Sequence, residues 1–208
     1  KFDTSFDGST VDHLYGFNNL FEIYQKADKS ISTTVTVPVL WDKKNETIVN
    51  NESSEIIRIF NNAFNNITKN DFDFYPEDLR STIDEFNDDI YNNINNGVYK
   101  CGFAKTQESY DLAVKNLFES LDRVENALEG RDFLVGNQLT EADIRLIPSL
   151  IRFDSVYFIH FKCSIKKISD YKNISRYLKK HYAIDAVYKT TNHLHIKRHY
   201  YFSHRMIN

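Results

Sequence analysis

One run of apolar residues constrains the fold of this chain more than any other feature. The apolar side chains step alternately by four and three positions, at Tyr110, Val114, Leu117, Leu121, Val124 and Leu128. This spacing places them on one face of an α-helix, and such a face needs another surface to bury it. The pattern stops at Gly130. The segment therefore predicts a long helix packed within a helical domain.

The rest of the second half shows the same helical periodicity. One helix is predicted from about Ile83 to Gly97 and another over 174–181. Between them, Thr140 and Asp143 form an S/T-x-x-D/E capping pattern ahead of an apolar run that contains Pro148. Capping explains this polar pair without a catalytic role, and the proline is expected to kink the helix that follows.

The first half mixes helical and strand patterns. Apolar positions predict a helix over 11–27, and VTVPVLW (35–41) and ETIVN (46–50) predict a hairpin, followed by a helix up to 67. The predicted fold class is therefore α+β then all-α. Helix–hairpin–helix occupies 1–67, a linker with Pro76 occupies 68–79, and an all-helical domain occupies 80–208.

Composition narrows the class of protein. The chain has 208 residues, of which 41% are hydrophobic, and its net charge of −3 gives no basic surface for nucleic acid or an anionic membrane. The longest apolar runs are too short to cross a bilayer, and no signal peptide opens the sequence. Its two cysteines favour a reducing compartment. These features predict a soluble, cytoplasmic protein.

The histidines and cysteines of the sequence do not form the patterns expected of a metal site or of a catalytic thiol. His195 and His199 lie four residues apart, but no third ligand follows at metal spacing, so no metal is expected. Cys101 and Cys163 do not stand in a C-P-x-x setting at a helix start, where a thiolate would be stabilised. Both cysteines are therefore predicted to be structural.

Long strings of the sequence resemble one protein family. They are VTVPVLWDKKNETIVNNESSEIIRIFN, NGVYKCGFAKTQESY, LTEADIRLIPSLIRFDSVYFIHFKC and HIKRHYYFSH. Together they resemble the glutathione transferase superfamily, and within it the Xi class or glutathionyl-hydroquinone reductases, which include omega-like fungal and bacterial transferases. The resemblance implies a partial thioredoxin-like, glutathione-binding domain followed by the helical C-terminal domain of the transferases, in a cytoplasmic homodimer.

The resemblance also implies a binding site for glutathione as co-substrate. Val37, before a cis Pro38, would present its backbone to the cysteinyl part of glutathione like an added strand. Glu52 and Ser53, at a helix start, would hold the γ-glutamyl end. From the residues alone, Pro38 equally suits an edge strand, and Glu52 and Ser53 suit ordinary capping.

Two tyrosines would face the second substrate. The resemblance assigns Tyr99 in NGVYKCGFA and Tyr157 in RFDSVYFIHF to the binding and orientation of a hydroquinone ring. Without the resemblance, each is as well explained as a half-buried helix residue, because the chain has 13 tyrosines.

The implied reaction needs a cysteine that the sequence does not contain. The family reduces S-glutathionyl-hydroquinones to hydroquinone and glutathione disulfide with a cysteine in a C-P-W-A-like motif, expected in a β-α-β unit upstream of this chain. A further departure is Thr33-Thr34, where Gly-Arg is common in the family. The alternatives are a non-catalytic remnant or interaction module and, with less support, general glutathione conjugation through a tyrosine or serine.

Overall fold

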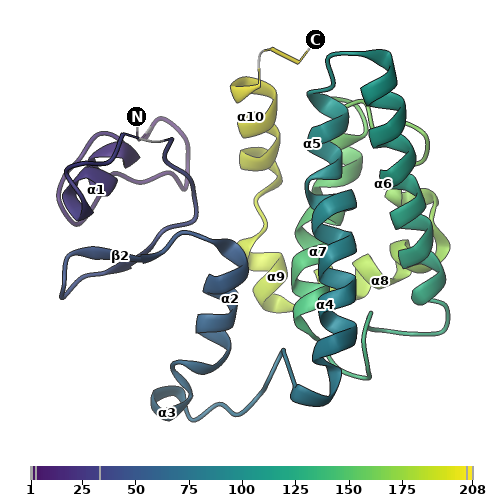
Figure 1. The fold of residues 1–208 in the computed structure, drawn as a ribbon, viewed down its shortest axis with the longest axis horizontal. Helices are drawn as coiled ribbons and strands as arrows, with labels where there is room; N and C mark the ends of the chain where they lie inside the picture. The colour runs from purple at the N-terminus through teal and green to yellow at the C-terminus, as the bar shows by residue number, and fades with distance from the viewer. Residues whose placement is uncertain (1, 3, 33, 205, 208) are drawn as a thin grey trace. The chain divides into compact units, whose positions relative to one another are not determined.

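The computed structural model describes residues 2, 4–32, 34–204 and 206–207. It divides the chain into two compact units, residues 1–72 and residues 73–208. The first unit holds the small sheet and the second is helical (Figure 1). The fold class predicted from the sequence, α+β followed by all-α, is confirmed.

The first unit is built around a two-stranded hairpin. Strand β1 pairs antiparallel with β2, and Trp41 lies opposite Ile48. The elements of this unit are α1 (Leu20–Ala27), β1 (Leu40–Asp42), β2 (Thr47–Asn50), α2 (Ser53–Asn62) and α3 (Asn65–Thr68). The last two replace the single helix predicted up to residue 67, because the chain leaves the helix at Ala63 and Phe64.

The prediction of a helix over the whole of 11–27 was wrong in its first half. The Asp12 carboxylate accepts hydrogen bonds from the backbone N–H groups of Leu14 (2.9 Å) and Phe17 (3.1 Å). Such a local turn competes with the helical hydrogen-bond pattern, and Gly16 adopts a positive φ of 71° within it. The helix begins only at Leu20, after Asn19 and Glu22 form a capping box.

The strand predicted over 35–41 is also shorter than its composition suggests. Its regular part starts at Leu40, which pairs with Asn50, the last residue of β2. Among the described residues no other strand lies beside 35–39, and Pro38 has no N–H to donate. β-branched residues favour a strand only where a neighbouring strand supplies ladder partners.

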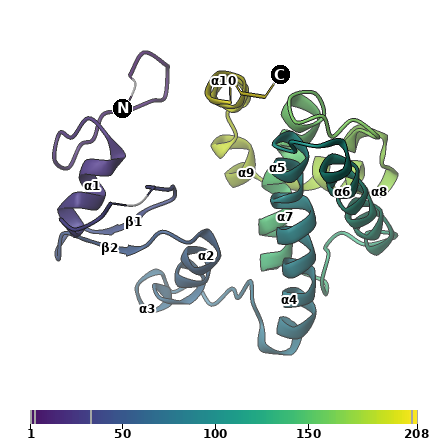
Figure 2. The ribbon, with the colours of Figure 1, turned by 45° about the horizontal axis from the view of Figure 1, so that its top comes forward.

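The second unit packs its helices around the stripe found in the sequence. The side chains of Leu117, Leu121 and Val124 are at most 1% exposed on α6, which lies beside α5 in both ribbon views (Figures 1 and 2). The helices are α4 (Arg80–Asp89), α5 (Gly97–Gly102), α6 (Gln107–Ala127), α7 (Glu141–Arg152), α8 (Lys172–Tyr182), α9 (Asp185–Thr190) and α10 (His193–Ser203). None of the helices in the described part of the chain is long and apolar enough to cross a membrane.

Two π-helical segments lengthen helices of this unit. Residues Ile90–Asn95 join α4 to α5, so the helical path predicted to end near Gly97 continues to Gly102. Residues Phe153–Tyr157 (η3) continue α7. A π-helical turn rotates the side chains that follow it relative to an α-helix, and such turns are common at functional sites.

The carboxylate of Asp143 joins the start of α7 to two other parts of the unit. One oxygen accepts from the Thr140 N–H (2.9 Å) and hydroxyl (3.1 Å), which confirms the capping box. The other accepts from the Leu134 N–H (3.0 Å) and from the Tyr177 hydroxyl on α8 (2.8 Å). Asp143 is 0% exposed, so water could not take the place of its carboxylate as the acceptor for these four donors.

Replacing Asp143 by alanine should therefore destabilise the helical unit strongly. Leaving several buried donors unpaired costs about 3 kcal/mol or more of the free energy of unfolding. Urea denaturation followed by circular dichroism measures the loss. The control Asp111→Ala removes an exposed carboxylate on α6 and should change stability by less than about 0.5 kcal/mol. Equal losses in the two variants would contradict this account.

Two glycines of α5 make a matched test of its packing. A Cβ atom at Gly102 would lie 2.7 Å from Cγ of Phe161, whereas one at Gly97 would meet Leu117 at an ordinary 3.7 Å. Gly102→Ala should therefore destabilise the protein by about 1–3 kcal/mol through overpacking. Gly97→Ala should be neutral or stabilise it by up to about 1 kcal/mol, since alanine favours a helix. Thermal melting of both variants checks the contrast.

Candidate functional site

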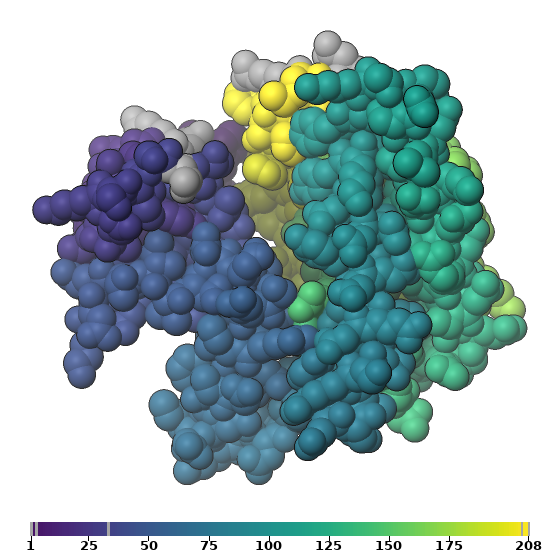
Figure 3. Space-filling view, in the orientation of Figure 1, coloured from purple at the N-terminus to yellow at the C-terminus, as the bar shows by residue number. Residues whose placement is uncertain are grey.

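Three tyrosine hydroxyls meet in the second unit. The hydroxyl of Tyr200 on α10 lies 2.8 Å from that of Tyr99 on α5 and 2.9 Å from that of Tyr157 in η3. We call these three residues the tyrosine cluster. In the space-filling view the atoms of α10 lie against those of α5, as this contact requires (Figure 3). The two tyrosines singled out from the sequence are therefore neighbours, joined through a third.

Burial sets the protonation state of the tyrosine cluster. Tyr157 is 2% exposed and Tyr200 is 7% exposed, and Tyr99 is half-buried. Burial, followed by the influence of Tyr200, raises the pKa of both Tyr99 and Tyr157 far above the ordinary value of 10.0. These phenols stay protonated at physiological pH, so they can donate hydrogen bonds to an oxygen of a bound molecule.

Aromatic rings form the wall around these hydroxyls. Phe103 stacks parallel to Tyr99 at a centroid distance of 6.4 Å, and Phe161 lies 5.1 Å from Tyr99 and 5.3 Å from Tyr157. The positive charge of Arg152 acts on both Tyr99 and Tyr157. An apolar, aromatic wall with a few polar groups suits a flat, aromatic ligand with hydroxyl groups.

Sequence reasoning missed Tyr200, although the signal was present. Tyr200 stands in HIKRHYYFSH, a string that contributed to the family resemblance but to no site residue. The helix α10 that carries it had not been predicted. Its role depends on which of two adjacent tyrosines turns inward, and only the structure shows that Tyr200 is buried while Tyr201 is exposed.

The predicted glutathione-binding residues lie in the first unit. The Val37–Pro38 peptide bond is cis, as expected, and Val37 is 76% exposed. Glu52 occupies the N-cap position of α2 without a side-chain capping bond, and Ser53 is the first residue of the helix; both are exposed. Thr33 lies outside the described residues.

Asn51 ties the two parts of this predicted site together. Its Nδ2 donates to the hydroxyl oxygens of Thr36 (3.2 Å) and Tyr24 (3.1 Å). The Tyr24 hydroxyl in turn donates to the Thr36 carbonyl (2.8 Å). Because Thr36 precedes Val37 and Asn51 precedes Glu52, this contact places the cis peptide close to the start of α2.

Neither cysteine has the surroundings of a nucleophile. Cys101 and Cys163 are free and buried, at 1% and 0% exposed. The hydrogen bond between the two thiols lowers the pKa of Cys101 and, together with burial, raises the pKa of Cys163. Because both side chains are buried, neither sulfur is open to a substrate from solvent, which agrees with the structural role predicted for both residues.

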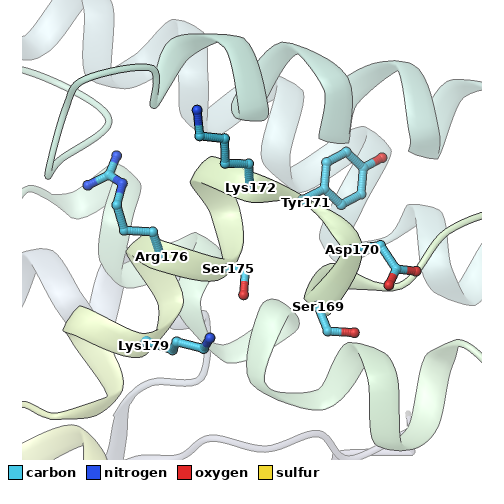
Figure 4. Close-up of a pocket in the computed structure, with 7 residues that line it drawn as sticks. All are labelled: Ser169, Asp170, Tyr171, Lys172, Ser175, Arg176 and Lys179. Carbon is cyan, nitrogen blue, oxygen red and sulfur yellow. The ribbon is translucent and has the colours of Figure 1, made fainter.

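A surface hollow on α8 does not contain any of the predicted site residues. Its volume is about 460 Å³, and seven residues between Ser169 and Lys179 line it (Figure 4). The guanidinium of Arg176 binds Asp132 (3.1 Å) and the carbonyl of Leu128 (2.8 Å). The carboxylate of Glu125 accepts from the N–H groups at the start of α8. These groups are therefore occupied by the fold itself.

The structure shows no grouping typical of a metal site. In the ranges given above, no three His, Cys, Asp or Glu side chains gather closely enough to hold an ion. His195 and His199 both lie on α10, and neither belongs to such a group in that part of the chain.

Comparison with known proteins identifies the family. Residues 107–180 match the model of the glutathione S-transferase C-terminal domain. The chain is 53% identical over 207 residues to the glutathionyl-hydroquinone reductase YqjG of Escherichia coli, covering all of this chain and 63% of that protein. It is 48% identical to the glutathione S-transferase omega-like 2 of Schizosaccharomyces pombe, covering all of this chain and 69% of that one.

Solved structures agree with the sequence relatives. The glutathione-bound structure of Escherichia coli YqjG superposes with a TM-score of 0.97, over all of this chain and 67% of that one. Glutathione transferase Xi 1 from Trametes versicolor is 50% identical, with a TM-score of 0.95 over 99% of this chain and 72% of that one. This chain thus spans about two thirds of the length of its relatives. It belongs to the Xi class of glutathione transferases, the family of the glutathionyl-hydroquinone reductases.

Proposed function

We propose that the protein containing this chain reduces S-glutathionyl-hydroquinones to hydroquinones at the expense of glutathione. The observation that carries the proposal is the tyrosine cluster, in which the hydroxyls of two buried tyrosines and one half-buried tyrosine meet beside an aromatic wall. Such an arrangement fits the ring and hydroxyl groups of a hydroquinone. The relative named as a glutathionyl-hydroquinone reductase supports the same substrate class.

The proposed reaction proceeds through two exchanges at sulfur. A cysteine thiolate from a segment upstream of this chain attacks the sulfur of the glutathionyl adduct, and a mixed disulfide with glutathione forms. The electron pair of the broken carbon–sulfur bond passes to the ring carbon, which takes up a proton as hydroquinone leaves. A second glutathione thiolate then attacks the mixed disulfide, releasing glutathione disulfide and restoring the cysteine.

The tyrosine cluster would orient the hydroquinone during the first exchange. A protonated phenol can donate to a ring oxygen, and the raised pKa of Tyr99 and Tyr157 keeps both protonated. Because Tyr200 bonds to both, its hydroxyl fixes their positions and orients one donor toward the ligand. Fixed donors align the carbon–sulfur bond with the attacking thiolate, as proximity effects require.

The first unit would hold glutathione itself. The exposed backbone at Val37 offers strand-like hydrogen bonds to the cysteinyl part. Glu52 offers a carboxylate to the amino group, and Ser53 with the α2 N-terminus suits the α-carboxylate. The glutathione-bound structure of the YqjG relative supports glutathione as the ligand.

The proposal extends to the assembly and its compartment. We propose a homodimer that works in the cytoplasm, where glutathione is kept reduced. The family resemblance supports both statements. Light scattering coupled to size-exclusion chromatography checks the dimer.

Removing the Tyr200 hydroxyl should impair turnover. In the protein with its upstream segment, Tyr200→Phe should lower kcat/KM for a glutathionyl-hydroquinone at least about tenfold, the equivalent of one lost hydrogen bond of 1.4 kcal/mol. Chromatography of released hydroquinone measures the rate. The control Tyr188→Phe alters an exposed tyrosine of α9 and should leave the rate unchanged.

The same assay separates the competing functions. A reading frame upstream that encodes a strand followed by C-P-x-x supports the reductase, and replacing that cysteine should abolish hydroquinone release. A protein that lacks this motif and releases no hydroquinone would instead be the non-catalytic module.

Charge removal at Glu52 should weaken glutathione binding. Glu52→Gln should raise the Kd about tenfold, because a charge-assisted hydrogen bond to the glutathione amino group is worth about 1.5–3 kcal/mol. Isothermal titration calorimetry with reduced glutathione measures the change. Glu55→Gln is a matched control in the same helical turn, where the carboxylate accepts from the Asn50 side chain instead. Equal effects of the two variants would point to the helix dipole rather than to contact.

A further inference from the structure

Three imidazoles surround the outer side of the tyrosine cluster. His204 follows α10 and lies 6.1 Å from His160, with rings inclined by only 22°, and 6.0 Å from His199 (centroid distances). We call His160, His199 and His204 the histidine cluster. His160 comes from the turn after η3, and the other two come from α10 and its end. The cluster therefore spans the contact between α10 and the rest of the unit.

Aromatic rings pack against His160 and His204, whereas His199 is exposed and its Nδ1 lies 3.4 Å from the Ser203 hydroxyl. The His204 ring packs against Phe103 (5.5 Å) and Phe161 (5.6 Å), and the His160 ring packs against Tyr201 (4.7 Å). Nδ1 of His204 and Nε2 of His160 are buried and have no hydrogen-bond partner among the described residues. A proton placed on either of these two nitrogens would have no hydrogen-bond acceptor in the described part of the chain.

The titratable groups that face the cluster are phenols and other imidazoles. Tyr200 on α10 and Tyr99 on α5 lie 5.6 Å and 6.5 Å from the His204 ring. The charges that act on His204 are those of His199 and His160, both of which become positive when protonated. Arg152, at the end of α7, adds a fixed positive charge beside the phenols.

We propose that protonation of the histidine cluster releases α10 and withdraws Tyr200 from the tyrosine cluster below neutral pH. The contact that α10 makes through the cluster tolerates neutral rings but not several like charges. Since Tyr200 lies on the same helix, the loss of this contact also breaks its bonds to Tyr99 and Tyr157. This pH-dependent release of α10 would weaken the binding of any ligand that the tyrosine cluster holds.

The direction of the pH effect follows from the surroundings of His204. Burial, then the charges of His199 and His160, lowers the pKa of His204 below its ordinary value of 6.5. A group whose pKa is lowered in the docked state favours docking above its ordinary pKa, and this contribution is lost as the pH falls through the lowered value. For each pKa unit of the shift, full protonation weakens docking about tenfold.

Hydrogen exchange followed by mass spectrometry tests the proposal on the full chain. Corrected for intrinsic exchange rates, the protection of α10 amides should fall measurably between pH 7.5 and pH 5.5, by at most about tenfold for the titration of one imidazole, while that of α6 holds. The double variant His160→Gln with His204→Gln should lose less than about half of its α10 protection over the same range. Lys197→Gln, at an exposed position of the same helix and outside the cluster, should behave like the unmodified protein.

Two results would overturn the proposal. One is α10 protection that does not change with pH in the unmodified protein, and the other is an equal fall in the double variant. If the double variant does not fold, as loss of α6 protection would show, imidazole titration of the unmodified protein by NMR decides. His204 titrating at or above 6.5 would then refute the proposal. These measurements need no turnover, so failure of the proposed reductase activity leaves them interpretable.

Discussion

The buried carboxylate of Asp143 is the contact on which the helical unit depends. It is shared by the start of α7, the loop at Leu134 and the Tyr177 hydroxyl of α8. The bonds of Asp143 fix the residue at which α7 begins. Because η3 continues α7, the position of Tyr157 in η3 depends on that starting residue. A polar interaction at the start of α7 therefore helps to place Tyr157 of the tyrosine cluster.

Hydrogen bonding and close packing act together at the tyrosine cluster. Phe161 approaches α5 closely because Gly102 has no side chain to keep it away. That approach places an aromatic ring between α5 and η3, beside both Tyr99 and Tyr157. The two π-helical segments lie next to these contacts and adjust which side chains face inward. The backbone irregularities of this unit thus coincide with its proposed site.

The sequence predicted those parts of the fold that depend on periodicity and on motifs. The stripe of α6 and the capping box of Asp143 are regular patterns, and both appear in the structure as expected. The segment 11–19 was predicted wrongly because its apolar spacing is helical while the Asp12 side chain holds a turn. The strand at 35–39 failed for another reason: its composition favours a strand, but pairing requires a neighbour that the sequence pattern does not reveal.

The same distinction applies to the candidate site. Tyr99 and Tyr157 were found through motifs, whereas Tyr200 could not be separated from Tyr201 until the orientation of α10 was known. Hydroxyl groups that come together from distant segments produce no periodic pattern in the sequence. Their juxtaposition is a product of tertiary packing.

The bond between Tyr99 and Tyr200 joins residues that are 101 positions apart. Closing so long a loop comes late in folding, after local helical contacts have formed. During synthesis the ribosome releases α4, α5 and α6 well before α10. A nascent chain can therefore form the contacts among α4, α5 and α6 before the tyrosine cluster is complete, because the cluster needs Tyr200 of α10.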